Sequence, residues 1–114
     1  MRLLNERTGV AVAEHVELAT TRSERRRGLL GRTSLPPKSA LLLRPCAAIH
    51  TAFMRFAIDV VFLDREGRAV RILRALRPWR MALALRASSV IELPSGCLDG
   101  VDLMPGDRVR LVRE

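Results

Sequence analysis

The sequence predicts a β-rich α+β fold, namely a compact antiparallel barrel or folded sheet with one or two short helices. Short apolar runs recur along the chain and are separated by turn residues, a pattern typical of proteins built mainly from strands. The length of 114 residues suits one domain that spans residues 1–114. Because 48% of the residues are hydrophobic, the chain can form a core without metals or disulfides.

The N-terminal residues predict three short strands. Apolar residues at positions 3–4 and 10–12 flank a polar stretch that includes Gly9, and this arrangement predicts two strands joined by a turn. Residues 16–18 then alternate between apolar and acidic side chains, which is the period of a strand with one buried face. We therefore expect the chain to begin with a hairpin followed by another strand.

A helix is expected after these strands. Ser23 can act as its N-cap, Glu24 would lie in the positive first turn, and Gly31 can form the left-handed C-terminal stop. Residues 35–38 contain two prolines, which cannot continue a helix or a strand interior, and therefore predict a loop.

The middle of the chain predicts buried strands. Residues 40–43 form a short apolar run, and residues 58–63 are apolar on both faces except at Asp59. A strand that is apolar on both faces is expected in the interior of a sheet. A turn that includes Gly67 leads to residues 69–76, which we expect to return as the second arm of a hairpin.

The C-terminal third predicts two further strands. Residues 78–87 fit either a strand or a helix, because apolar residues alternate there but alanines lie between them. Residues 90–93 predict a strand, and a short helical turn is expected directly after it. A turn at residues 105–107 precedes the last strand at residues 109–111.

The two cysteines and the N-terminus bear on cellular location. Cys46 and Cys97 are expected to be reduced, buried thiols, because a secreted disulfide scaffold normally contains more cysteines, although a bridge between them is the alternative. No apolar stretch approaches the ~20 residues that span a membrane, and the first twenty residues contain no continuous apolar signal region. We expect a cytoplasmic protein with no membrane partner, no metal and no other cofactor.

The composition is strongly basic. The net charge is +8, and nineteen of the twenty basic residues are arginine. Such a preference for arginine is typical of a GC-rich genome. A bacterial source is a separate expectation. Codon bias explains the choice of arginine over lysine but not the excess of positive charge, and a basic domain attracts nucleic acid or acidic partners.

Three pieces of the chain together are similar to one protein family. They are Glu24-Arg25-Arg26-Arg27-Gly28-Leu29-Leu30-Gly31-Arg32, the segment from His50-Thr51 through Met54-Arg55-Phe56 to Ile58-Asp59, and Val90-Ile91-Glu92-Leu93-Pro94-Ser95-Gly96. The chain resembles the uncharacterised bacterial and archaeal family DUF192 (domain of unknown function 192). Two positions depart from the family pattern, Ala57 in place of Pro and Ser95 in place of Ala. The resemblance implies a small β-rich fold with short helices, but it implies no function.

The segment between Cys46 and Asp59 carries the most varied chemistry. Cys46, His50, Thr51, Arg55 and Asp59 provide a thiol, an imidazole, a hydroxyl, a guanidinium and a carboxylate. The leading interpretation is a non-catalytic domain that binds a small polar or anionic ligand, or a protein partner, near these residues. A thiol-dependent enzyme, in which His50 activates Cys46, is less favoured because no catalytic-cysteine signature is present. If the segment has no shared function, Cys46 belongs to the core, His50 is a loop histidine with satisfied hydrogen bonds, and Asp59 either caps backbone donors or pairs with an arginine.

The arginines provide an alternative function, sequence-tolerant binding of nucleic acid. Such binding needs a basic patch, usually with aromatic side chains that stack on bases. The candidate residues are Arg22, Arg25, Arg26, Arg27, Trp79 and Arg80. A solvated arginine surface without a function is the simpler explanation of the same residues.

Overall fold

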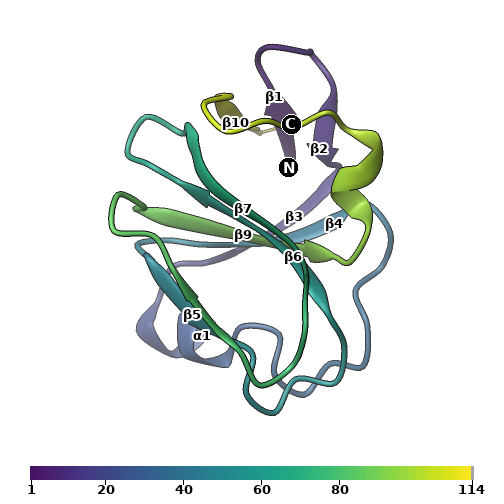
Figure 1. Cartoon of the computed structure of the whole chain (residues 1–114), viewed down its shortest axis with the longest axis vertical. Helices are drawn as coiled ribbons and strands as arrows, with labels where there is room; N and C mark the ends of the chain where they lie inside the picture. Colours follow the sequence, from purple (N-terminus) through teal and green to yellow (C-terminus); the bar gives the residue numbers. More distant parts are fainter. Residues whose placement is uncertain (114) are drawn as a thin grey trace.

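In the computed structural model, which describes residues 1–113, a five-stranded sheet forms the middle of the molecule (Figure 1). Its strands, in spatial order, are β3 (His15–Ala19), β4 (Ser39–Leu43), β9 (Ser89–Pro94), β6 (Ile58–Leu63) and β7 (Ala69–Leu76). Neighbouring strands are antiparallel except β3 and β4, which run parallel. The chain crosses from β3 to β4 through the helix α1 (Arg22–Arg27), and such a crossover is what a parallel pair requires.

Smaller layers cover both faces of this sheet. One face is covered by β1 (Arg2–Asn5), β2 (Ala11–Ala13) and β10 (Val109–Val112), which form a second sheet. The opposite side carries α1 and a two-stranded ribbon of β5 (Ala48–His50) and β8 (Met81–Leu83) (Figure 1). The sheets therefore form layers, and the closed-barrel alternative of the sequence analysis is wrong, whereas the β-rich α+β class is confirmed.

Two hydrophobic cores lie on the two faces of the middle sheet. The α1-side core contains Ala19, Leu29, Leu41, Leu43, Ile49, Met54, Ile58, Val60, Phe62, Ala82 and Val90. The β1-side core includes Leu3, Val12, Ala13, Leu42, Val61, Leu63, Ile91, Leu93, Leu98, Leu103 and Val109. Successive residues of β6 and β9 contribute to alternate cores, as the two-residue period of a strand requires. All of β6 is consequently buried, as the sequence predicted.

The helix differs from its predicted boundaries. Thr21, not Ser23, is the N-cap: its Oγ1 accepts the backbone N–H of Glu24 at 3.1 Å, and the Glu24 carboxylate accepts the backbone N–H of Thr21 at 3.0 Å. This reciprocal capping box satisfies two backbone donors at once, which Ser23 could not do at its position. The helix ends at Gly28, before the predicted Gly31.

The remaining elements agree with the sequence except in the β5–β8 ribbon. The sequence analysis did not predict β5, and it left residues 78–87 undecided between a strand and a helix. A 3₁₀-helix, η1 (Cys97–Gly100), follows β9 as expected. Among the described residues, no helix has both the length and the apolar character needed to cross a membrane.

Asp59 ties three elements together beneath the β1-side core. Its side chain is buried, and its Oδ1 accepts the backbone N–H of Ala75 at 2.9 Å. Its Oδ2 accepts the backbone N–H groups of Gly96 and Leu98, each at 3.1 Å. These bonds join β6 to the irregular end of β7 and to the start of η1. Capping of backbone donors is the role that the sequence analysis gave Asp59 as an alternative to a functional one.

We predict that Asp59→Ala destabilises the fold severely. The substitution leaves three backbone donors without their acceptor, and we expect the free energy of unfolding to fall by about 3 kcal/mol or more. Urea denaturation followed by circular dichroism measures this change. The matched control is Asp64→Ala, because Asp64 caps Glu66 and Arg68 in a surface turn where water can replace it. Equal effects of the two substitutions would contradict the prediction.

Candidate functional site

A pocket of about 260 Å³ lies between α1, β5 and β9. We call it the Glu92 pocket. Its lining includes Arg25, Arg27, Gly28, Cys46, His50 and Glu92, together with apolar side chains of the α1-side core. Polar groups at an otherwise apolar cavity are the usual composition of a small-molecule site.

Glu92 is the unusual member of this lining. Along β9, Val90 contributes to the α1-side core, and Glu92 faces the same side because it lies two residues further on. Its register partners on the neighbouring strands are Leu41 and Val60, both in that core. The Glu92 residue is only 4% exposed, and within residues 1–113 its Oε1 has no hydrogen-bond partner. A buried carboxyl group without a partner is unfavourable, so its presence in the sheet requires an explanation.

Burial raises the pKa of Glu92 to about 7, and the positive charge of Arg32 opposes the shift only partly. The Arg32 guanidinium also forms a surface ion pair with Glu17 at 2.7 Å, so its charge is shared with a second carboxylate. A carboxyl group with this pKa is divided between its protonated and ionised forms near neutral pH. It can therefore donate a hydrogen bond to a ligand or accept one from it.

The end of α1 lies directly over this carboxyl group. Gly28, the C-cap of α1, has φ 48° and ψ −125°, a conformation that residues with a Cβ rarely adopt. A methyl group on its Cα would lie 3.8 Å from Oε1 of Glu92. A larger side chain here would occupy space next to the carboxyl group, so glycine serves both the backbone turn and the open pocket.

Of the five residues predicted to bind a small ligand, Cys46 and His50 line the Glu92 pocket. Cys46 is half-buried, and its Sγ donates a hydrogen bond to the Ala48 carbonyl oxygen at 3.2 Å. Burial raises the pKa of its thiol, and the charge of Glu92 acts in the same direction. Reactive cysteines have the opposite property, a lowered pKa, so these surroundings do not favour a nucleophilic thiol. His50 is exposed at the end of β5.

The other three predicted residues do not line this pocket. Thr51 is buried, and its Oγ1 donates to the Arg77 carbonyl oxygen at 2.6 Å and accepts the Arg80 backbone N–H at 2.8 Å. Asp59 serves the opposite face of the sheet, and Arg55 is exposed in the loop after β5. The arrangement needed for a Cys-His-Asp triad is therefore not assembled.

The two cysteines are both free and half-buried, as opposed to fully buried. Cys46 packs against the α1-side core and Cys97 against the β1-side core, so the middle sheet separates them. Within residues 1–113 no group of three or more metal-binding side chains is found.

The candidate nucleic-acid residues meet at one end of the molecule. Arg25, Arg26 and Arg27 line the Glu92 pocket next to His50, while Arg22 is exposed at the start of α1. His50 also lines a shallow depression that is shared with Trp79 and Arg80. Segments that are far apart in the sequence thus form one continuous surface through the β5–β8 ribbon.

Sequence reasoning missed Glu92 and Gly28. The signal for Glu92 was a single acidic residue within an otherwise apolar strand, because an acid between Ile91 and Leu93 must enter a core when both faces of the strand are covered. Gly28 carried no comparable signal, since its distance from Glu92 depends on how α1 packs against the sheet.

We predict that Glu92→Gln stabilises the protein above neutral pH. The folded-state pKa of Glu92 is raised from 4.5 to about 7, so the wild-type protein is destabilised as pH rises through this interval. The penalty is absent below the unfolded-state pKa, and it reaches the order of 3 kcal/mol once pH exceeds the folded-state pKa. Thermal unfolding of both proteins across this range is the measurement. A difference in Tm that does not change with pH would contradict the assignment.

We also predict that Cys46 reacts slowly with thiol reagents. In a Cys97→Ser background, alkylation of Cys46 by iodoacetamide at neutral pH should be slower than alkylation of free cysteine, because burial disfavours the thiolate. Mass spectrometry of timed samples gives the rate. A rate faster than that of free cysteine would restore the thiol-enzyme interpretation.

Comparison with known proteins places the chain in a family. The model of the DUF192 family, described as an uncharacterised ACR, matches residues 3–111. A UPF0127 protein of Thermococcus sibiricus is 34% identical over 112 residues, covering 94% of this chain and 72% of the relative. Another from Pyrococcus furiosus is 32% identical over 114 residues, covering 94% of this chain and 95% of the relative. Both relatives are archaeal, so they do not support the expected bacterial source.

Two solved structures share the fold. A chain from Sinorhizobium meliloti 1021, described as a candidate transcription regulator, superposes with a TM-score of 0.82 at 23% identity, over 96% of this chain and 89% of the other. A protein of unknown function from Novosphingobium aromaticivorans has a TM-score of 0.77 at 21% identity, over 95% and 91% of the two chains. The family match over nearly the whole chain confirms the resemblance found in the sequence: the protein belongs to the uncharacterised family DUF192.

Proposed function

We propose that this protein is a non-catalytic binding domain whose Glu92 pocket takes a small zwitterionic ligand of about the size of an amino acid. The observation that carries the proposal is the buried Oε1 of Glu92, a residue that lines a cavity; among the described residues this atom has no hydrogen-bond partner. A ligand that supplies the missing hydrogen bond would remove the cost of leaving this group unpaired.

An ammonium group is the ligand chemistry that suits Glu92 best. It carries three hydrogen-bond donors, and its positive charge would compensate the ionised carboxylate in a dry environment. A charged partner would also stabilise the ionised form, which burial alone disfavours. The cavity of about 260 Å³ has room for a small molecule and little more.

A second, anionic group on the ligand suits the rest of the lining. Arg25, Arg26 and Arg27 line the same pocket, and arginine binds carboxylates through paired hydrogen bonds. A purely cationic ligand would be repelled by these arginines, whereas a zwitterion matches both ends of the pocket. This proposal keeps the small polar ligand of the sequence interpretation and moves its centre from Arg55 and Asp59 to Glu92.

A binding role fits the pocket better than catalysis. The raised pKa of Cys46 disfavours its thiolate, and Asp59 is engaged with backbone donors on the far face of the sheet. The remaining groups can hold a ligand but provide no activated nucleophile. The expected cytoplasmic location stays a prediction.

We predict that L-leucine and other small L-amino acids raise the Tm of the wild-type protein. Matched compounds that lack one charged group, such as isocaproate and isoamylamine for L-leucine, should shift Tm much less. A ligand at a hundred times its Kd stabilises a protein by about 2.7 kcal/mol, which shifts Tm by several degrees for a domain of this size.

The variant Glu92→Gln should lose this shift, whereas Glu66→Gln, in an exposed turn, should keep it. The wild-type shift should grow as pH rises through about 7, because Glu92 ionises there. If carboxylates alone stabilise both variants equally, the pocket is an anion site in which Glu92 has no part, and the proposal is wrong.

A further inference from the structure

The outer face of the β5–β8 ribbon is exposed, and three of its four residues, Ala48, Met81 and Leu83, are apolar, while the fourth is His50. Ile49 and Ala82 face inward and belong to the α1-side core. Met81 and Leu83 alternate with Ala82 and therefore face outward, and Met81 is 77% exposed. The ribbon thus packs against the α1-side core through its inner face, and its outer face is exposed to solvent.

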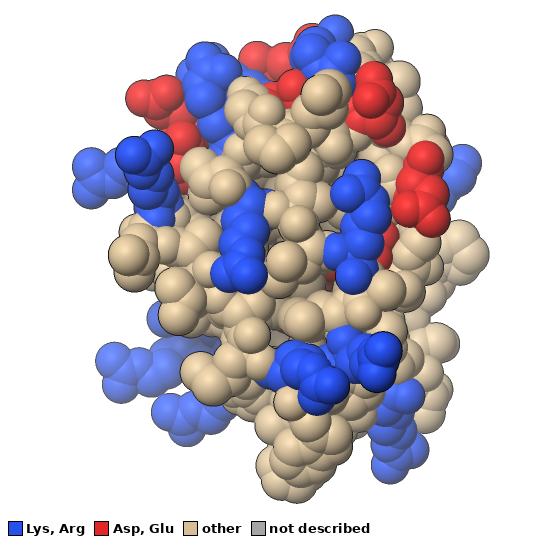
Figure 2. Space-filling model, viewed as in Figure 1, with Lys and Arg blue, Asp and Glu red and all other residues tan. Residues whose placement is uncertain are grey.

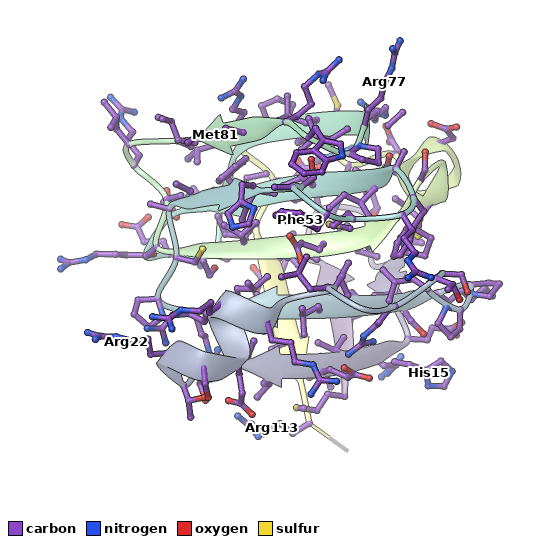
Figure 3. All side chains as sticks on the ribbon, turned by 90° about the horizontal axis from the view of Figure 1, so that it is seen from below. His15, Arg22, Phe53, Arg77, Met81 and Arg113 are labelled. Atoms are coloured by element: carbon purple, nitrogen blue, oxygen red, sulfur yellow. The ribbon has the colours of Figure 1, made fainter. Side chains whose placement is uncertain are left out.

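Other exposed apolar side chains continue this face. Phe53 and Trp79 are 72% and 61% exposed, and their rings contact each other with centroids 4.6 Å apart. Leu85, in the turn after β8, is 94% exposed. We call the set Phe53, Trp79, Met81, Leu83 and Leu85 the β8 patch. In the end view of Figure 3, Phe53, Met81 and the neighbouring Arg77 lie in the same half of the molecule.

The protein fixes the aromatic part of the β8 patch in place. Phe53 and Trp79 both have φ of 64°, a left-handed conformation that residues other than glycine rarely adopt. The Trp79 backbone N–H donates to the Thr51 carbonyl oxygen at 3.0 Å, and the Thr51 hydroxyl binds the turn on both sides of Trp79. Thr51 is therefore a positioning residue that presents Trp79 to solvent at the cost of a strained backbone.

The chain segments that carry the β8 patch contain basic residues and no acidic ones. Residues 25–58 and 67–91, which supply the patch and its surroundings, contain thirteen lysines and arginines and no aspartate or glutamate. Arg77, Arg80 and Arg86 are exposed directly beside patch residues in the chain. In the view of Figure 2 the acidic side chains gather at the upper end, and the lower end shows an uncharged protrusion flanked only by basic side chains.

We propose that the β8 patch docks on the surface of an anionic lipid bilayer. The aromatic and aliphatic side chains enter the headgroup region, and the surrounding arginines contact lipid phosphates. Tryptophan is enriched at this depth of a membrane, and basic residues near an anionic surface each add to binding. The sequence-based expectation of no membrane partner rested on the lack of a spanning stretch, and surface docking needs none.

A bilayer fits these observations better than other occupants. The most exposed patch side chains, those of Leu85, Met81 and Phe53, lie on the ribbon and its adjoining loops and are largely in solvent, so they suit a deformable layer better than the rigid surface of a folded partner. A second copy of this chain would bring two basic surfaces together, which repel each other. Bases of a nucleic acid stack on aromatic rings but not on the aliphatic side chains that make up most of the patch.

Trp79 provides a direct readout, because it is the single tryptophan and the chain contains no tyrosine. The full-length protein is mixed with vesicles of phosphatidylcholine, alone or with about one third phosphatidylglycerol, at low and high salt. Matched vesicles carry bromine on the acyl chains. We expect the protein to sediment with the anionic vesicles and to bind them at least about tenfold more tightly than the neutral vesicles. We also expect the brominated lipid to quench the fluorescence of Trp79.

Two pairs of variants test the apolar and basic parts separately. The double substitution Met81→Ser with Leu85→Ser should weaken vesicle binding at least about tenfold. The control pair Val10→Ser with Met104→Ser removes exposed apolar side chains outside the patch and should leave vesicle binding unchanged. Arg77→Glu with Arg80→Glu should abolish the preference for anionic vesicles. The control pair Arg65→Glu with Arg113→Glu makes the same change in net charge outside the β8 patch. These variants should keep most of the preference for anionic vesicles.

The proposal is overturned if the vesicles do not sediment the protein, or if they do so without quenching, which would mean electrostatic adsorption alone. It is also overturned if the patch and control pairs weaken binding equally. Binding of a single-stranded RNA oligonucleotide with no vesicle binding would instead assign this surface to nucleic acid. Thermal unfolding of every variant confirms that it is folded before binding is compared.

Discussion

The fold depends on the burial of β6 and β9 on both faces. Strands this apolar are stable only when a layer covers each side of the sheet, because exposure of either face would lose the free energy of burying its side chains. The β1–β2–β10 sheet provides one cover, and α1 with the β5–β8 ribbon provides the other. The first cover is assembled from both ends of the chain, since β1 pairs with β10. The cooperative unit therefore includes almost the whole sequence.

Two carboxyl groups are buried on opposite faces of this sheet, and they differ in their hydrogen-bond partners. Asp59 accepts three backbone N–H groups, so its charge is compensated by the loop and strand that it holds. Oε1 of Glu92, on the neighbouring strand, accepts no hydrogen bond from the part of the chain that the structure describes, and burial raises the pKa of that residue to about 7. A group that is unfavourable for the fold and lines a cavity is the kind of exception expected at a functional site.

The charge distribution gives the two ends of the molecule different character. Ion pairs join acidic and basic side chains around β1 and β10, for example Arg7 with Asp107 at 2.8 Å. This contact holds the pKa of Asp107 well below its usual range. The end formed by α1 and the β5–β8 ribbon carries several arginines, among them Arg25, Arg26 and Arg27, together with the Glu92 pocket and the β8 patch. His50 lies between the pocket and the depression beside Trp79, so an occupant of one surface would be adjacent to the other.

By itself, the sequence determined the family, the β-rich α+β class and most strands, because two-residue alternation and turn residues are local signals. Of the five residues that the sequence suggested for ligand binding, the structure places Cys46 and His50 in the lining of the Glu92 pocket, and ligand binding itself stays a prediction. Only the tertiary structure decided the parallel pairing of β3 with β4, the existence of β5 and the place of Glu92 and Gly28 in the site. It also separated Asp59 from Cys46, residues that the sequence had grouped by proximity. The physical reason is that the burial of a residue and its hydrogen-bond partners depend on the layer that covers it. For Glu92, that layer comes from segments far away in the chain.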